Sequence, residues 1–122
     1  MLILGAFNFQ RRIRLLALGK IFERLVYSYL IYGDENCLID SGVASSDSVI
    51  FDYVRNSGRN PEEISLMILT HAHPDHIGSA KAIEEATRCT VAAHENAKHW
   101  IEDVDLQFQE RPVPGFHSLV GE

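Results

Sequence analysis

The sequence predicts a small α+β domain in which helices pack in a layer against a β-sheet. Segments typical of strands alternate with segments of helical periodicity, in the order strand, strand, helix, strand, helix, strand, helix. The chain has 122 residues, of which 46% are hydrophobic and 23% are charged, an ordinary composition for a globular protein. This length suits one domain, so we expect residues 1–122 to form a single unit.

The N-terminal part of the chain predicts a β-hairpin. Residues 1–20 are ambiguous, with strands favoured. Residues 25–32 are rich in β-branched and aromatic side chains and predict a strand. Residues 33–36 carry Gly, Asp and Asn, which favour a turn, and residues 37–40 then form the returning strand.

Two capping signals predict the next helical segments. Ser46 is the expected N-cap of a helix that ends at Gly58, and its apolar residues recur at helical spacing: Val49, Ile50, Tyr53 and Val54. The sequence Asn-Pro-Glu-Glu at residues 60–63 combines an N-cap residue, a proline in the first turn and a glutamate three residues on. It predicts a single helical turn.

The following segments continue the alternation. Residues 66–69 form a continuous apolar run, which is typical of a strand covered on both faces. A helix is expected over residues 79–88, with one apolar face made of Ala80, Ile83 and Ala86. Residues 90–93 predict a short strand and residues 95–101 a short helix, and the chain from Asp105 on is expected to be loop or extended because it contains Pro112, Pro114 and Gly115.

Charge and cysteine usage exclude several classes. The net charge is −6, and residues 34–122 carry sixteen Asp and Glu but only six Lys and Arg, so nucleic acid is not an expected partner. No apolar run approaches the roughly 20 residues of a membrane-spanning helix. The apolar start precedes the arginines, the reverse of a signal peptide, and we expect a cytoplasmic protein. Cys37 and Cys89 lack a nearby second cysteine and are expected to be buried free thiols.

Residues 71–76 concentrate side chains that bind metals. The sequence His-Ala-His-Pro-Asp-His places three of the six histidines and one aspartate within six positions. Imidazole and carboxylate groups are the usual ligands of zinc and other first-row metals. His71 and His73 are two residues apart, so an extended chain directs both to the same side, and Pro74 keeps His73 out of the helical region. We expect these two histidines to converge on one metal ion.

The same motif suits a second metal. Asp75 and His76 fall at the start of the next helix, where consecutive side chains point in different directions, and two-metal sites have ions about 3.5–4 Å apart. Thr70 either bonds within this site or caps the loop. The remaining histidines, His94, His99 and His117, fit a ligand role less well.

The motif resembles the His-x-His-x-Asp-His signature of the metallo-β-lactamase superfamily. Leu-Ile-Asp-Ser-Gly at residues 38–42 is similar to an Ile-Asp-Thr/Ser-Gly element of that family, and residues 27–31 resemble its Asn/Ser-Tyr-Leu-Ile strand. The matches span residues 25–95 in the family's order. The resemblance implies an αββα sandwich, of which this sequence covers only the first, N-terminal αβ half, and the second half with its further ligands is absent.

The resemblance also implies roles for individual residues. His71 and His73 would bind the first metal, and Asp75 and His76 the second. Asp40 would orient a ligand histidine through a hydrogen bond. Asp75 is in addition the expected catalytic residue, because it would orient the nucleophilic water and later protonate the leaving group. The implied cofactor is zinc, as one or two ions, with iron or manganese as alternatives.

The implied function is a metal-dependent hydrolase. A bound metal lowers the pKa of water toward about 7, so that hydroxide attacks a carbonyl or phosphoryl centre at neutral pH. The small-molecule substrate stays open among thioesters, lactones and phosphoesters. The alternative is a non-catalytic metal-binding fragment, truncated or completed as a split assembly. A half-sandwich exposes an apolar sheet face, so we expect a homo-oligomer or a partner chain to cover it.

Overall fold

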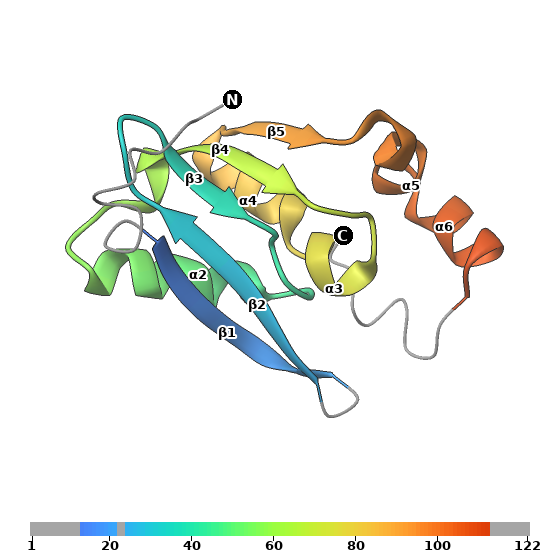
Figure 1. The fold of residues 1–122 in the computed structure, drawn as a ribbon, viewed down its shortest axis with the longest axis horizontal. Helices are drawn as coiled ribbons and strands as arrows, with labels where there is room; N and C mark the ends of the chain where they lie inside the picture. The colour runs from blue at the N-terminus through green and yellow to red at the C-terminus, as the bar shows by residue number, and fades with distance from the viewer. Residues whose placement is uncertain (1–12, 22–23, 113–122) are drawn as a thin grey trace.

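The computed structural model describes residues 13–21 and 24–112, and within them five strands form one sheet (Figure 1). The first two neighbouring pairs of strands are antiparallel and the last two are parallel. The strands follow one another in space as they do in the sequence: β1 (Ile13–Ile21), β2 (Arg24–Ile31), β3 (Asn36–Ile39), β4 (Ile64–Leu69) and β5 (Thr90–Ala93).

Helices connect the parallel strands and extend the chain beyond β5. In the view of Figure 1, α2 and α4 lie behind the sheet, on one of its faces. None of the described helices is long and apolar enough to cross a membrane. The helical segments are α2 (Ser46–Asn56), η1 (Pro61–Glu63), α3 (Pro74–Ile77), α4 (Ala80–Thr87), η2 (Glu95–Ala97), α5 (Lys98–Glu102) and α6 (Val104–Glu110).

The core lies between the sheet and the α2–α4 layer. Leu30, Leu38 and Met67 are paired across β2, β3 and β4, so they share one face of the sheet, and all three are fully buried. They meet Ile50 of α2 and Ile83 of α4 in the same hydrophobic cluster. This face therefore supplies most of the apolar burial of the described chain.

Several sequence predictions are confirmed. The α+β class is correct, and β2 and β3 form the predicted antiparallel hairpin. Asn60 caps η1 with the full capping box, since its side chain accepts from the Glu62 backbone while the Glu63 carboxylate accepts from the Asn60 N–H at 2.9 Å. Cys37 and Cys89 are buried free thiols. Of the ambiguous first 20 residues, 13–20 lie in a strand and residues 1–12 fall outside the described chain.

The prediction that the 66–69 run is covered on both faces is wrong. Met67 and Leu69 are buried, but Leu66 and Ile68 on the opposite face are only half-buried. A continuous apolar strand needs layers on both sides, and the described residues provide one layer only.

Two apolar positions assigned to buried helix faces are exposed. Val49 is 47% exposed, and Ala86 also lies on the surface, whereas the neighbouring Phe51 and Thr87 are buried instead. Helical spacing predicts a stripe about 100° wide, but only the packing of each helix on the sheet decides where that stripe is centred.

Two helix boundaries also differ from the prediction. Ser46 is the first residue of α2 rather than its N-cap, because the preceding Ser45 adopts a left-handed conformation with φ of 68° and its side chain makes no capping bond. The chain from Asp105 is not loop, because α6 spans Val104–Glu110. The carboxylate of Asp103 accepts from the Leu106 N–H at 3.0 Å and so caps the start of this helix.

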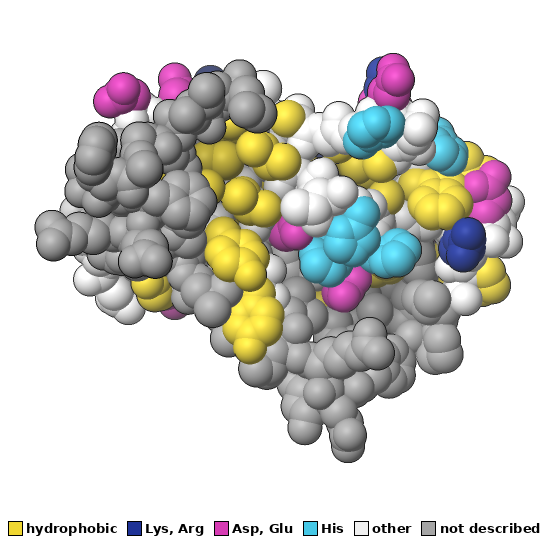
Figure 2. All heavy atoms as spheres, in the orientation of Figure 1, with side chains coloured by type: hydrophobic (Ala, Val, Ile, Leu, Met, Phe, Trp, Pro, Cys, Tyr) yellow, Lys and Arg dark blue, Asp and Glu magenta, His cyan; other side chains and the backbone are white. Residues whose placement is uncertain are grey.

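The opposite face of the sheet is apolar and open. The pairing places Tyr29, Ile39, Ile68 and Ala92 in one row across β2 to β5. Tyr29 is 40% exposed and the other three are half-buried. Figure 2 shows hydrophobic side chains gathered on this side of the molecule, beside a cluster of histidines. We call this surface the open sheet face; it comprises Tyr27, Tyr29, Ile31, Ile39, Leu66, Ile68 and Ala92.

The burial of a side chain predicts how much its truncation lowers the free energy of unfolding. Leu38→Ala removes a fully buried side chain from the centre of the core, and we expect it to lower the free energy of unfolding by about 2–5 kcal/mol. The exposed Val49→Ala in α2 is the control and should change it by less than about 1 kcal/mol. Urea unfolding followed by circular dichroism measures both, and equal losses would contradict this placement of the core.

Candidate metal site

The 71–76 motif lies at the carboxyl end of β4, an interior strand of the sheet between β3 and β5. The strand ends at Leu69, and α3 begins at Pro74. Between them His73 is extended, with φ of −66° and ψ of 144°, as expected for a residue before proline. Ala72 and Pro74 point inward and are buried, whereas His73 is exposed. The motif therefore combines an extended segment with the first turn of a short helix.

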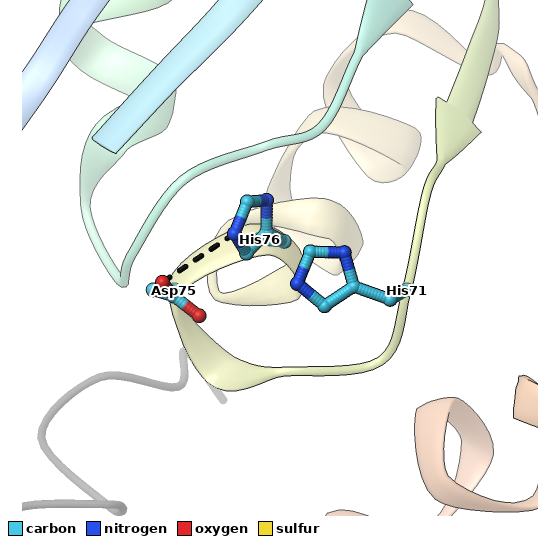
Figure 3. Close-up of side chains that lie close together, drawn as sticks. All are labelled: His71, Asp75 and His76. Atoms are coloured by element: carbon cyan, nitrogen blue, oxygen red, sulfur yellow. Dashed lines mark ion pairs between the residues drawn. The ribbon is translucent and has the colours of Figure 1, made fainter. Parts of the chain in front are cut away.

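Three side chains of the motif come together. One ligand atom each from His71, Asp75 and His76 lies within 4.8 Å of the others (Figure 3). The ring centroids of the two histidines are 3.9 Å apart, and Asp75 Oδ2 is 3.4 Å from His76 Nε2, the pair joined by the dashed line in Figure 3. Two imidazoles and a carboxylate at this separation form a donor set for a first-row metal ion.

His73 stands at the edge of this group rather than within it. Its ring meets the ring of His71 edge-on, with centroids 4.8 Å apart, and its side chain is exposed. The structure thus groups His71 with the two ligands on α3. The predicted division into a His71–His73 pair and an Asp75–His76 pair stays a prediction.

Asp40 connects β3 to the motif through a buried carboxylate. It is only 5% exposed, and its φ of 61° is a left-handed conformation that aspartate tolerates better than most residues. Oδ1 accepts from the Thr70 N–H at 2.8 Å, and Oδ2 accepts from the Thr70 hydroxyl at 2.7 Å. Oδ2 also lies 2.9 Å from Nδ1 of His76. The structure therefore brings Asp40 into contact with one histidine of the group.

This network fixes which imidazole nitrogens face the metal position. An ionised Asp40 can only accept, so Nδ1 of His76 must carry a proton. The Thr70 hydroxyl donates its one proton to Asp40, so at 2.9 Å from Nδ1 of His71 its oxygen must accept a hydrogen bond from the Nδ1–H of that ring. Nε2 of each ring is then the nitrogen left to bind a metal. Thr70 is thus part of the site, one of the two roles that the sequence left open for it.

The residues after Asp40 hold α3 against β3. Ser41 donates twice to the carbonyl oxygen of His76, from its backbone N–H at 2.8 Å and from its hydroxyl at 2.9 Å. The Gly78 N–H donates to the Gly42 carbonyl at 2.7 Å, and Gly42 has a φ of 72°, which glycine adopts without strain. The Asp-Ser-Gly turn and the histidine motif are therefore joined by backbone as well as side-chain bonds.

The charge states of the three titrating groups follow from their surroundings. Burial lowers the pKa of His71, and the neighbouring imidazoles of His76 and His73 lower it further. Burial alone would lower the pKa of His76, but the hydrogen bond to Asp40 and the charge of Asp75 raise it overall. Burial would likewise raise the pKa of Asp40, yet the bonds from His76 and Thr70 outweigh it and keep the pKa low. A lowered pKa favours the neutral form of the His71 imidazole, which is the form that binds a metal.

The other histidines are engaged elsewhere. Nδ1 of His94 accepts from the Asn96 N–H at 3.1 Å and caps η2, and the ring of His99 lies 5.5 Å from that of Trp100. His117 falls outside the described residues. No sequence motif indicated Gln107, whose side-chain amide donates to the backbone oxygen of Ala72 inside the motif. It lies on α6, a helix that the sequence did not predict.

Most of the chain matches one known protein family. The profile of the Metallo-beta-lactamase superfamily matches residues 21–120, which includes β2 through α6 and the whole histidine motif. This chain belongs to the metallo-beta-lactamase superfamily. The membership confirms the family inferred from the His-x-His-x-Asp-His motif and the Ile-Asp-Ser-Gly element.

Individual members of the superfamily resemble the chain over part of their length. It is 36% identical over 80 residues to the probable metallo-hydrolase YqgX of Bacillus subtilis, covering 65% of this chain and 36% of that protein. It is 36% identical over 73 residues to the probable metallo-hydrolase MJ0888 of Methanocaldococcus jannaschii, covering 59% of this chain and 34% of that protein. The chain spans about a third of the length of these curated relatives.

A solved structure shows the same partial fold. The metallo-beta-lactamase MIM-1 from Novosphingobium pentaromativorans superimposes with a TM-score of 0.60 at 27% identity, covering 70% of this chain and 31% of that one. The chain thus has a partial metallo-beta-lactamase fold.

The hydrogen bonds of Asp40 predict that a substitution at this residue weakens metal binding. Asp40→Asn removes the charge that accepts from His76 Nδ1, so we expect Zn²⁺ to bind about 10–100-fold more weakly. The control is Asp34→Asn, an exposed aspartate in the turn between β2 and β3. Competition with a chromophoric chelator measures both dissociation constants. An unchanged affinity in Asp40→Asn would show that the carboxylate does not orient His76.

Proposed function

We propose that the chain is the metal-binding part of a metal-dependent hydrolase, with the ion held by His71, Asp75 and His76. The observation that carries this proposal is the convergence of their three ligand atoms within 4.8 Å at the end of β4. Two features support it: the hydrogen bonds of Asp40 and Thr70 leave both Nε2 atoms available, and two curated relatives carry the name of probable metallo-hydrolase.

The donor set fits a metal of catalytic type. Catalytic zinc sites keep about three protein ligands and leave a coordination position for water or substrate. Nitrogen and carboxylate donors suit zinc and also accommodate iron or manganese. We propose zinc as the native metal. A second ion would draw on His73, which lies beside His71 at the exposed side of the group.

The chain's own residues supply the remaining chemistry. When bound, the metal lowers the pKa of a coordinated water and polarises a carbonyl or phosphoryl oxygen. Asp75 is partly exposed, with 34% of its side chain accessible, so its carboxylate can accept a proton from water and return it to a leaving group. Asp40 is buried and acts through His76, so it orients a ligand without touching the substrate.

The substrate class extends the same proposal. A water molecule activated in this way attacks an electrophilic carbonyl or phosphoryl centre, and we propose a small thioester, lactone or phosphoester. Because the chain spans about a third of its curated relatives, the residues that select among these substrates need not lie in it. The same fact favours the alternative, a metal-binding unit without turnover of its own.

Metal analysis tests this function. We expect the protein to contain about one metal ion per chain or more, and His71→Ala to lose both the metal and any hydrolysis of generic thioester, lactone and phosphodiester substrates. His94→Ala is the control, because that histidine caps η2 and should leave the metal content unchanged. Metal without turnover would favour the non-catalytic alternative, and the absence of bound metal after incubation with Zn²⁺, Fe²⁺ or Mn²⁺ would refute the proposal.

We further propose that a second copy of the chain covers the open sheet face. No residue of that face carries a charge, so two copies can meet there without repulsion despite a net charge of −6. Sheets that pack face to face lie about 10 Å apart and interdigitate apolar side chains of the kind found here.

Analytical ultracentrifugation tests this association. We expect the wild-type chain to sediment as a dimer and Ile68→Asp to shift it toward monomer, because a buried carboxylate at the interface would be desolvated. Val49→Asp on the opposite side, in α2, is the control and should leave the dimer intact. A wild-type chain that stays monomeric would contradict a second copy and point to a different partner chain.

A further inference from the structure

The one buried residue of α6 is a glutamine. Gln107 is only 1% exposed, whereas the rest of α6 is exposed or half-buried. Glutamine is mostly found on protein surfaces, because a buried amide must replace its hydrogen bonds to water with internal ones. An apolar side chain would fill this position without losing hydrogen bonds to water. We therefore expect the buried amide to have a specific hydrogen-bond partner.

The partner is the backbone of the histidine motif. Gln107 Nε2 donates to the carbonyl oxygen of Ala72, and Oε1 has no hydrogen-bond partner among the described residues. Ala72 is itself 4% exposed and lies between His71 and His73. The single described polar interaction of this buried amide is therefore directed at the segment that carries two of the predicted metal ligands.

Hydrogen bonds stabilise both ends of α6, the helix that carries Gln107. At its start Asp103 caps the Leu106 N–H. At its end Glu110 accepts from the indole N–H of Trp100 in α5 at 2.5 Å. Because α6 is held in this way, the bond to Ala72 ties the motif to a defined element rather than to a free loop.

The hydrogen bond from Gln107 to Ala72 lies where it affects the directions of the His71 and His73 side chains. In an extended segment neighbouring side chains alternate between opposite sides, so the buried Ala72 leaves His71 and His73 directed toward the other side. The Ala72 carbonyl belongs to the peptide that joins it to His73, and Pro74 restricts the next residue. Fixing this carbonyl thus sets the backbone rotation that aims both imidazoles.

We propose that Gln107 is a positioning residue for the metal site, acting through the Ala72 carbonyl on His71 and His73. This inference rests on the proposed metal binding. Gln107 is not one of the three grouped ligands, so its loss should loosen the geometry of the site while leaving every ligand in place.

Two nearly isosteric variants separate the hydrogen bond from packing. Gln107→Met keeps the volume but removes the donor, and Gln107→Glu replaces the donor with a carboxylate that repels the Ala72 oxygen. The matched control is Gln109→Met, two residues on in α6 but exposed. We expect Co²⁺ and Zn²⁺ to bind about tenfold more weakly to both Gln107 variants, with an altered visible spectrum of the Co²⁺ form, and the control to match wild type.

Thermal unfolding of the metal-free variants, measured alongside, distinguishes positioning from support of the fold. Weaker metal binding and a changed Co²⁺ spectrum at temperatures where the variant is fully folded would support the inference. Unchanged affinity and spectrum in both variants, with or without a lower melting temperature, would overturn it while leaving metal binding itself intact. If the wild-type chain binds neither Co²⁺ nor Zn²⁺, the proposed function and this inference both fail.

Discussion

The buried carboxylate of Asp40 is the constraint on which the rest of the site depends. A charge removed from water must be compensated, and here the backbone and hydroxyl of Thr70 and the imidazole of His76 compensate it together. Each of these donors belongs to the 70–76 segment. The hydrogen bonds to the single Asp40 carboxylate at the end of β3 therefore hold the motif at the end of β4 in position. The same bonds set the tautomers of two histidines, which links the folding of the sheet directly to metal chemistry.

The sheet divides the molecule into two unlike faces. One face packs Leu38 and Met67 against α2 and α4, and the other leaves Tyr29 and Ile68 partly accessible. The metal group lies at the carboxyl ends of the strands, where the parallel part of a sheet usually carries its ligands. In Figure 2 the histidine cluster adjoins the apolar surface.

Local sequence signals predicted the elements whose cause is local. The Asn60 capping box and the turn before β3 depend on residues within a few positions, and both were predicted correctly. The exposure of Val49 and Ala86 was not predicted, because the direction of a helix face depends on what the helix packs against. The helix α6 was missed because nearby prolines and a glycine favour loop. Asp103 caps its start, and bonds from Trp100 in α5 and to the distant Ala72 stabilise it further.

The sequence by itself determined the family and predicted which side chains bind a metal, because ligand chemistry and the two-residue spacing around Ala72 are properties of a short segment. Only the tertiary structure decided which ligands meet. It grouped His71 with Asp75 and His76, left His73 at the exposed edge of this group, and brought Gln107 into contact with Ala72. The physical reason is that convergence on one ion depends on backbone rotations, and contacts from β3 and α6, 30 or more residues away along the chain, hold those rotations in place.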